Sequence, residues 1–367
     1  MEGLVTIFRE VRDPRDFNAR HDLSAMLFLA LAATLCGAKS CVEIADFAEA
    51  NAATLGEIVD LAHGVPSHDS FSRLFRLLDP DELGAALKRF AAALRQALGL
   101  GAPRGVVALD GKSLRRGYER GRAAMPPLIV GAWDAETRLS IAARRADGGD
   151  EIKATLEVLK ALVLKGCVVT ADALHCHPRM AEAVRAAGAH YALGLKANHG
   201  PLYRAAMAAF ERADAGGKLG VHETIDRDHD RRERRQVSVI ARPADAPTFP
   251  GLVALARIEA ERQAADGTVH TTTRYVALSK RFPPHRVLEI TRAHWSIEND
   301  LHWQLDVVFH EDDARTRKNF APQNLAVIRR IALDILRAHP LDRSIGRKMK
   351  LAAWKREFFF ELFAHMR

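Results

Sequence analysis

The sequence has few of the features that build disulfide-stapled or membrane-bound proteins. It contains only four cysteines, and none of them shows the Cys-x-x-Cys spacing of zinc fingers or redox motifs, which indicates a reduced chain. The longest apolar run, residues 23–36, is shorter than the ~20 residues of a membrane span and predicts a buried helix. The first residues lack the basic start of a signal peptide. We therefore expect a soluble, cytoplasmic protein with no membrane partner.

Glycine and proline are also scarce, at 24 and 15 of 367 residues, whereas 48% of the chain is hydrophobic. This composition excludes a disordered or low-complexity chain. The chain, at 367 residues, is long enough for two or three domains. Acidic residues are outnumbered by basic ones, which leaves a formal net charge of +8. A basic surface favours an anionic partner such as nucleic acid, although an unspecialised basic enzyme has the same balance.

Residues 1–100 predict an all-helical N-terminal domain. Segments 23–36 and 42–53 are apolar helices, Ser67 is an expected N-cap, and another helix starts at Pro80. A glycine- and proline-rich stretch at residues 99–103 ends the domain. Such a unit either inserts a helix into DNA or forms only a packed bundle.

From residue 104 the pattern changes to that of an α/β protein. Buried strands are expected at 106–109, 128–130, 139–142, 167–170 and 191–195, with helices at 151–164 and 178–187. Three strands, helix, strand, helix and strand is the order of an RNase H-like core. A β-rich insertion is expected at about 218–280, helices resume at about 284 to close a core of 104–340, and 341–367 is a basic, aromatic helical tail.

Two aspartates end the buried strands of this core. Asp110 follows the first strand, and Asp172 follows the strand at 167–170. The carboxyl ends of neighbouring parallel strands lie at one edge of a sheet, where ligands of α/β proteins bind. An Asp-Gly pair after a strand is also a common turn, so either residue alone is weak evidence.

Two close carboxylates repel each other unless a cation lies between them. Oxygen ligands suit Mg²⁺ or Mn²⁺ better than zinc. Two such ions ~4 Å apart activate a water or 3′-hydroxyl and stabilise the departing oxygen in phosphodiester chemistry. A third carboxylate is then needed from later in the chain.

Glu298 is the best source of this third carboxylate. On one helix, His294, Glu298 and His302 share a stripe beside an apolar stripe formed by Ile297, Leu301, Leu305 and Val308. Asp306, Glu311 and Asp312 are rivals on spacing alone. The simpler interpretation of Glu298 is an exposed residue of a solvated helix.

At this point the chain resembles the DDE-type insertion-sequence transposases, specifically the H-repeat-associated (ISAs-type) family. The resemblance extends over nearly the whole length. It rests on residues 66–73 (PSHDSFSR), 108–115 (ALDGKSLR), 168–175 (VVTADALH), 191–198 (YALGLKAN) and 294–309 (HWSIENDLHWQLDVVF), followed by Glu311 and Asp312.

The resemblance implies an RNase H-like DDE domain in which Asp110, Asp172 and Glu298 bind two divalent ions. It implies cleavage of insertion-sequence ends, joining to target DNA, and a homodimer on DNA. The wider superfamily often has Tyr and Arg before the Glu and Lys after it. Thr291, His294 and Leu305 occupy those places here, so His294 or Arg292 is a candidate replacement for phosphate binding.

Other residues near these motifs are candidates for DNA contacts. They are Lys112, Arg115, Arg116, Lys196, Asn198, Arg292, His294, Trp295, Asn299 and His302. Basic side chains would hold phosphates, and Trp295 or Trp303 would stack on an extruded base. The alternatives are solvated loops for the basic residues and core packing for at least one tryptophan. The arginine-dense run 227–235 also contains acids, so a charged edge strand explains it as well as DNA does.

Three other functions remain open. A nuclease of the same fold would cut DNA without joining it, and a domesticated copy would bind DNA without cutting. A zinc protein using His175, Cys176 and His177 is disfavoured, because adjacent residues point in divergent directions and no second pair has finger spacing. No nucleophile-elbow motif for a serine or cysteine hydrolase is found.

Overall fold

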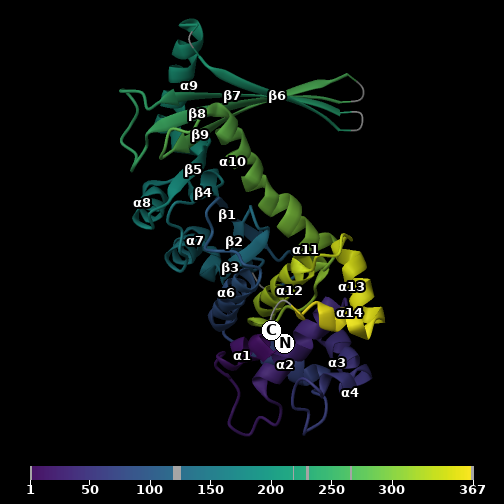
Figure 1. Cartoon of the computed structure of the whole chain (residues 1–367). Helices are drawn as coiled ribbons and strands as arrows, with labels where there is room; N and C mark the ends of the chain where they lie inside the picture. The colour runs from purple at the N-terminus through teal and green to yellow at the C-terminus, as the bar shows by residue number, and fades with distance from the viewer. Residues whose placement is uncertain (1, 119–124, 218, 229–230, 265–266, 365–367) are drawn as a thin grey trace. The chain divides into compact units, whose positions relative to one another are not determined.

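One mixed sheet organises the strands of the protein. The computed structural model describes residues 2–118, 125–217, 219–228, 231–264 and 267–364. In this part of the chain nine strands lie in the order β3-β2-β1-β4-β5-β9-β8-β7-β6 (Figure 1). Their bounds are β1 (Val106–Ser113), β2 (Leu128–Asp134), β3 (Leu139–Arg145), β4 (Val168–Ala171), β5 (His190–Leu195), β6 (Val221–Asp228), β7 (Arg231–Ala241), β8 (Ala254–Gln263) and β9 (Val269–Leu278).

The first five strands have the topology of an RNase H-like core. β2 and β3 form an antiparallel hairpin, whereas β1 pairs in parallel with β4, and β4 in parallel with β5. Parallel neighbours require crossovers, which α7 (Glu151–Lys160) and α8 (Pro178–Ala186) provide. β4 is buried at all four positions, as its unbroken apolar sequence predicts. The expected α/β, RNase H-like fold class is therefore confirmed.

The β-rich insertion continues the core sheet. β9 pairs antiparallel with β5, from Ala192 opposite Leu278 to Leu195 opposite Tyr275, and β8, β7 and β6 follow as antiparallel neighbours. The strands are longer than the apolar patterns at 236–240 and 271–278 indicate, because their outer halves are polar and exposed. β9, for example, is exposed from Val269 to Arg274 and buried from Tyr275 to Leu278.

By density of contacts the chain divides into two compact units. The first consists of Met1–Ala102, Gly111–Val158 and Glu298–Arg367, and the second of Pro103–Asp110 and Leu159–Ile297. The chain passes from one unit to the other at four points, and two of these, inside β1 and between Ile297 and Glu298, fall beside predicted metal ligands. The domain boundaries at 100, 104, 340 and 341 stay a prediction.

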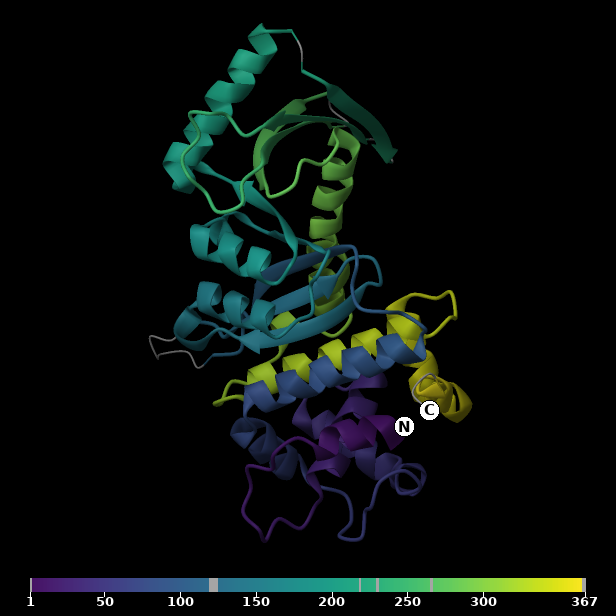
Figure 2. The same ribbon diagram turned by 60° about the vertical axis from the view of Figure 1, so that its left-hand side comes forward.

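In the first unit, the helices pack around two buried helices at residues 23–35 and 321–338. These helices are α1 (Glu2–Arg9), α2 (Leu23–Leu35), α3 (Cys41–Ala50), α4 (Ala52–Leu55), α5 (His68–Leu77), α6 (Pro80–Ala97), α11 (Trp303–Val307), α12 (Ala321–Ala338), α13 (Ile345–Trp354) and α14 (Arg356–Glu361). All thirteen residues of α2 are buried, which confirms the apolar run as a core helix. Ser67 caps α5 as expected, since its hydroxyl accepts a hydrogen bond from Ser70 N. α12 packs on α2, α5, α6 and β3, and Figure 2 shows α12 and α6 side by side.

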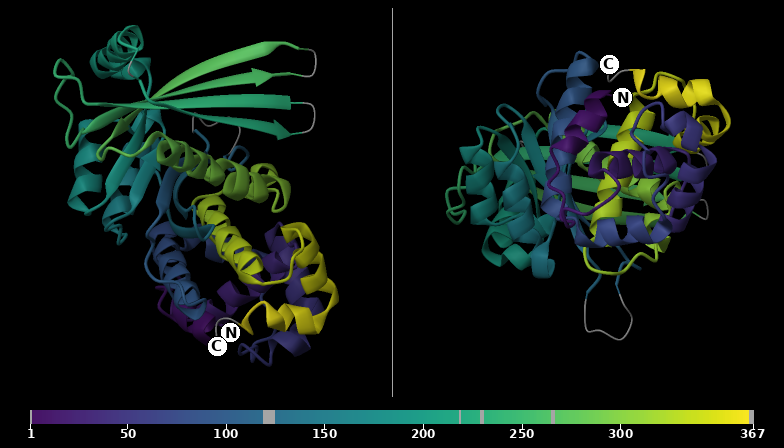
Figure 3. Two further views of the ribbon diagram at one scale, coloured as in Figure 1. Left: turned by 45° about the horizontal axis from the view of Figure 1, so that its top comes forward. Right: turned by 90° about the horizontal axis from the view of Figure 1, so that it is seen from below.

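In the second unit, two helices cover opposite faces of the sheet extension. Consecutive strand residues point to opposite faces. Accordingly, Tyr275 packs against Tyr203 and Phe210 of α9 (Gly200–Ala215), whereas the guanidinium of Arg274 lies 5.0 Å from the ring of Trp295 on α10 (Pro284–Ser296). Figure 3 shows α10 lying along β6, β7 and β8.

Among the described residues, no helix is both long enough and apolar enough to cross a bilayer.

Candidate active site

Asp110 and Asp172 lie at matching positions of adjacent parallel strands. The last paired residues of β1 and β4 that align are Ala108 and Thr170, and each aspartate follows two positions later. Asp110 does not end its strand as expected, because β1 continues to Ser113. Asp172 follows β4 and caps a short 3₁₀ helix, with Oδ1 accepting a hydrogen bond from Leu174 N at 2.9 Å. The backbone register therefore places the two aspartates at corresponding positions of adjacent strands, just beyond the residues that pair.

The helix that carries Glu298 is not a continuous α-helix. α10 ends at Ser296, residues Ile297–His302 form a π-helical turn, and α11 begins at Trp303. His294, Glu298 and His302, which were predicted to share one stripe of a regular helix, do not share their contacts around this wider turn. His294 hydrogen-bonds through Nδ1 to Thr170 Oγ1 at 3.1 Å, whereas His302 bonds through Nδ1 to Glu298 Oε2 at 3.3 Å. π-Helical turns are rare and are frequent at functional sites.

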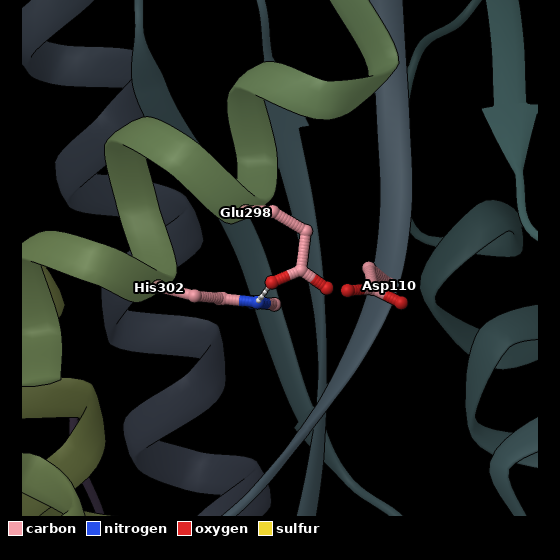
Figure 4. Close-up of side chains that lie close together, drawn as sticks. All are labelled: Asp110, Glu298 and His302. Carbon is pink, nitrogen blue, oxygen red and sulfur yellow. Dashed lines mark hydrogen bonds and ion pairs between the residues drawn. The ribbon is translucent and has the colours of Figure 1, made fainter. Parts of the chain in front are cut away.

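Three side chains converge at this turn. One ligand atom each from Asp110, Glu298 and His302 lies within 4.8 Å of the other two. Figure 4 shows the carboxylates of Glu298 and Asp110 pointing toward each other, with the imidazole of His302 beside Glu298. Two carboxylates and one imidazole this close form a donor set for a divalent cation.

This group differs from the predicted triad in one member. Asp172 is not part of it, and His302, expected as a DNA contact, takes that place. The side chain of His302 is 8% exposed and that of Glu298 is 49% exposed. The four-residue spacing of Glu298 and His302 is the sequence feature that could have placed His302 beside Glu298, since residues four apart on a helix are neighbours.

Another acid lies against Gly111, the residue after Asp110. The carboxylate of Glu151, at the start of α7, lies so close to Gly111 that a Cβ atom there would be 2.4 Å from Oε1. Glycine at position 111 therefore leaves room for a carboxylate directly after Asp110 in the chain. Glu151 could not be identified from local sequence, because the contact joins a strand to a helix forty positions later.

The basic residues after Asp110 are paired with acids of the segment that follows the π-helical turn. Lys112 is buried, and its Nζ lies 2.7 Å from Asp306 and 3.0 Å from Asp312. Arg115 and Arg116 reach Asp312 and Asp313 at 3.2 and 3.3 Å from exposed positions. The three cations thus have carboxylate partners, and of the three cationic side chains only those of Arg115 and Arg116 are exposed.

The rival acids for the third ligand are engaged elsewhere. Glu311 is 2% exposed and lies 3.4 Å from Arg330 and 4.0 Å from Arg329. Burial raises the pKa of Asp306, and its ion pair with Lys112 opposes that shift. These contacts account for Asp306, Glu311 and Asp312 without a metal ion.

The other predicted DNA contacts occupy scattered positions. Arg292 forms an ion pair with Asp226, and Trp295 is 45% exposed beside Arg274. Lys196 and Asn299 are exposed. The side chain of Asn198 lies outside the described part of the chain.

The alternative zinc residues have structural roles. Cys176 is fully buried, which raises the pKa of its thiol to about 12, so the thiolate that binds metal is disfavoured. His177 caps α8 by accepting a hydrogen bond from Met180 N, and burial lowers its pKa. Among the described residues, His175, Cys176 and His177 do not group as metal ligands.

Comparison with known proteins agrees with this geometry. The family model described as "Transposase DDE domain" matches residues 101–335, and the one described as "DDE_Tnp_1-associated" matches residues 5–91. A protein in the dhlA 3′ region of Xanthobacter autotrophicus is 35% identical, with 70% of this chain and 88% of that protein covered. YbfL and the H repeat-associated protein YhhI of Escherichia coli are each 28% identical, over 95% of this chain and 94% of theirs.

Among solved structures, a piggyBac transposase synaptic complex with hairpin DNA aligns at a TM-score of 0.44 and 12% identity, covering 100% of this chain and 81% of that one. Similarity at that level says nothing further about the site. The match over residues 101–335 covers more than half of the sequence and contains both strand aspartates and Glu298. The chain therefore belongs to the transposase DDE domain family.

Proposed function

We propose that this transposase cleaves the ends of an insertion sequence and joins them to target DNA, with Asp110, Asp172 and Glu298 as the ligands of two Mg²⁺ or Mn²⁺ ions. The observation that supports it most is the approach of Asp110 and Glu298, whose ligand atoms lie within 4.8 Å together with His302. Asp172, in register on the next strand, supplies the third carboxyl group.

The chemistry of the donors fits such ions. Carboxylate oxygens are the ligands that Mg²⁺ and Mn²⁺ prefer, and one imidazole is tolerated better by Mn²⁺ than by Mg²⁺. Bound divalent ions supply Lewis-acid activation of an attacking oxygen and stabilisation of a leaving oxygen in phosphodiester chemistry. Repulsion between Asp110 and Glu298, at this separation, disfavours a site in which both remain charged without a cation.

The remaining residues bind DNA or orient the metal ligands. His302 hydrogen-bonds to Glu298 Oε2 and so holds one oxygen of that carboxylate, as residues beside a metal ligand commonly do. Arg115, 79% exposed, and Arg116, 51% exposed, would exchange their carboxylate partners for DNA phosphates. Lys112, buried between two aspartates, is better placed to hold those aspartates than to reach DNA. Lys196, Arg292, His294, Trp295 and Asn299 remain proposed DNA contacts.

The larger organisation is proposed on the same basis. Residues 1–100 form the helical associated domain, 104–340 the DDE domain and 341–367 the C-terminal helical tail. Because two element ends must be cut together, a homodimer on DNA is expected.

The direct test is cleavage of DNA that carries the element's own terminal repeats. Asp110→Asn, Asp172→Asn and Glu298→Gln should each lower the cleavage rate at least about a thousandfold, because each removes several kcal/mol of charge stabilisation. DNA affinity measured without metal should be unchanged. Glu182→Gln, an exposed carboxylate of α8, is the matched control and should cleave normally.

The products separate this function from its rivals. Joined products establish transposition, cutting without joining leaves a nuclease, and DNA binding without cutting leaves a domesticated derivative. Full cleavage by Glu298→Gln would show that the third ligand is misassigned.

A further inference from the structure

The π-helical turn that carries Glu298 and His302 is held at its centre by two arginines. Arg138 Nη2 lies 2.5 Å from the carboxylate Oδ1 of Asp300, and Arg337 Nη2 donates to the main-chain oxygen of the same residue at 2.5 Å. Asp300 thus accepts hydrogen bonds through both its side chain and its main-chain oxygen. Asp300 lies two positions from Glu298 and two from His302.

The two arginines are themselves fixed. Arg138 closes the turn between β2 and β3 with a left-handed φ of 58°, which is uncommon for a residue with a side chain. Its carbonyl accepts a hydrogen bond from Arg337 Nη1 at 3.4 Å. The guanidinium of Arg337 also lies 4.7 Å from the ring of Trp133, which is fully buried in β2.

Burial and charge explain why arginine occupies position 337. Desolvation lowers the pKa of Arg337 to about 10, and Asp334 and Asp300 oppose that shift, so the group remains charged at neutral pH. Its planar fork offers several donors in fixed directions, which the flexible ammonium of lysine does not. Arg337 uses this fork to join α12, the β2–β3 turn and the π-helical turn.

We propose that Arg138 and Arg337 form a clamp on Asp300 that positions Glu298 for metal binding, together with His302, which hydrogen-bonds to it. This proposal rests on the proposed function of Glu298. A metal ligand on a helix with an irregular turn has less backbone support than one on a strand, so external contacts must set its place. Arg337 and Arg138 are positioning residues, because neither belongs to the group of metal-binding side chains.

Binding of Mn²⁺ to the full-length protein, followed by the electron paramagnetic resonance signal of the free ion, tests the clamp without DNA. Arg337→Gln should weaken Mn²⁺ binding by about 10- to 100-fold, as loss of residues that support metal ligands commonly does. Arg337→Lys should recover only part of that loss. Asp300→Asn should have a smaller effect, because the bond from Arg337 to the main-chain oxygen remains. Arg212→Gln, at a surface arginine paired with Asp245, is the control.

Cleavage at rising Mn²⁺ concentration provides the second readout. Arg337→Gln should approach the wild-type rate at high Mn²⁺, whereas Glu298→Gln should not. Unchanged Mn²⁺ affinity in Arg337→Gln would overturn the clamp, as would a cleavage defect that excess Mn²⁺ leaves untouched. If Glu298→Gln binds Mn²⁺ and cleaves normally, the proposed role of Glu298 as a metal ligand is wrong. That outcome is distinct from a failure of the clamp alone, in which only the arginine variants behave like the wild type.

A different observation concerns α13, which lies beyond the part of the chain that the family models match. Arg347, Lys350 and Trp354 are spaced three and four residues apart, so they share one face of this helix. All three are exposed, and Trp354 is 73% exposed. Within the described ranges neither Arg347 nor Lys350 has an acidic partner within ion-pair distance.

The start of α13 lies against the end of the helix that follows the π-helical turn. A Cβ atom on Gly346 would lie 3.9 Å from Cγ1 of Val308, which places the start of α13 against the end of α11. Trp303 and Val307 of α11 are also exposed, at 52% and 50%. Unpaired cations beside exposed aromatic rings are what nucleic-acid backbones and unstacked bases bind.

We infer that the α13 face of Arg347, Lys350 and Trp354 binds DNA, as an extension of the proposed function. Arg347→Ala/Lys350→Ala should weaken binding of a DNA duplex about tenfold and lower the slope of log affinity against log salt by roughly 2, since each lost phosphate contact removes about 0.9. Fluorescence anisotropy in metal-free buffer measures both quantities, independently of cleavage. Lys88→Ala/Lys153→Ala, two exposed lysines on other helices, is the charge-matched control.

Trp354 is tested with DNA that ends in unpaired nucleotides. Trp354→Ala should weaken that binding, and Trp354→Phe should restore most of it because a ring remains. An unchanged salt slope in the double variant would overturn the inference. A change in oligomeric state with unchanged DNA affinity would also overturn it, and would assign the face to a second copy of the chain.

Discussion

The two compact units differ in whether their ion pairs are buried or exposed. In the first unit, charges are buried in pairs, such as Arg95 with Asp134 and Glu311 with Arg330. In the second, the strands β6–β9 carry ion pairs such as Glu223 with Arg234 on a polar surface. Buried charges cost a large desolvation free energy unless their partners are held in place, whereas solvated pairs contribute little. We therefore expect ion pairs to contribute more to the stability of the first unit than to that of the sheet extension in the second.

The largest effect at a single, neutral pH should come from removing Glu311. Its carboxylate is 2% exposed and faces Arg329 and Arg330, so Glu311→Ala leaves two buried guanidinium groups without their acid. Breaking a buried pair from one side costs about 3–5 kcal/mol. Urea denaturation should show that loss in the free energy of unfolding.

A paired substitution checks this interpretation. Glu311→Met/Arg330→Met removes both charges and should be less destabilising than Glu311→Ala, because no buried charge then lacks a partner. A single variant as stable as the wild type would contradict the view that buried pairing holds the first unit together.

The next effect concerns Asp334, a buried carboxyl group on α12. Burial raises its pKa to about 8, although Arg337 and the hydrogen bond from Ser140 N act in the opposite direction. A folded pKa above the ordinary value of 3.8 means that the folded state holds the proton more tightly. This contribution to stability is complete below about pH 4 and is lost as the pH rises toward 8.

Asp334→Asn should therefore flatten the dependence of stability on pH. Over the window from about pH 4 to 8 the wild type should lose up to about 1.4 kcal/mol per pH unit relative to the variant. Thermal or urea unfolding at several pH values measures the difference. Parallel curves for the two proteins would show that Asp334 ionises normally in the fold.

The same contrast explains which parts of the site could be predicted from sequence. Asp110 and Asp172 follow apolar strand patterns, so their corresponding positions on neighbouring parallel strands could be predicted from local sequence. The continuation of β1 to Ser113 was not predicted. The RNase H-like order of strands and the buried α2 were predictable for the same reason. Patterns of period 2 and 3.6 encode elements and the faces that they bury.

The helical side of the site was harder to predict. The π-helical turn at Ile297–His302 coincides with contacts from Arg138 and Arg337, which come from distant parts of the chain. Lys112 and Asp312 are 200 positions apart, so their ion pair left no local signal in the sequence. The approach of His302 to Asp110 likewise depends on tertiary structure and not on spacing along one helix.

The smallest effect should come from the surface of the sheet extension. Glu223 accepts hydrogen bonds from Arg234 and Gln236 across the β6–β7 ladder, at 2.7 and 2.8 Å. In Glu223→Gln the charge is lost, yet Arg234 keeps a second acid, Glu261, at 3.5 Å, and all the groups remain in water. No charge is orphaned, in contrast to the loss of Glu311.

Glu223→Gln should therefore leave the urea midpoint of unfolding unchanged within error, and 1 M NaCl, at which the screening length is about 3 Å, should not alter that result. A clear loss of stability, abolished by salt, would mean that the ion pairs of β6–β9 act as a network that supports the extension. The distinction between the two units would then be one of burial alone, because charge would be structural in both.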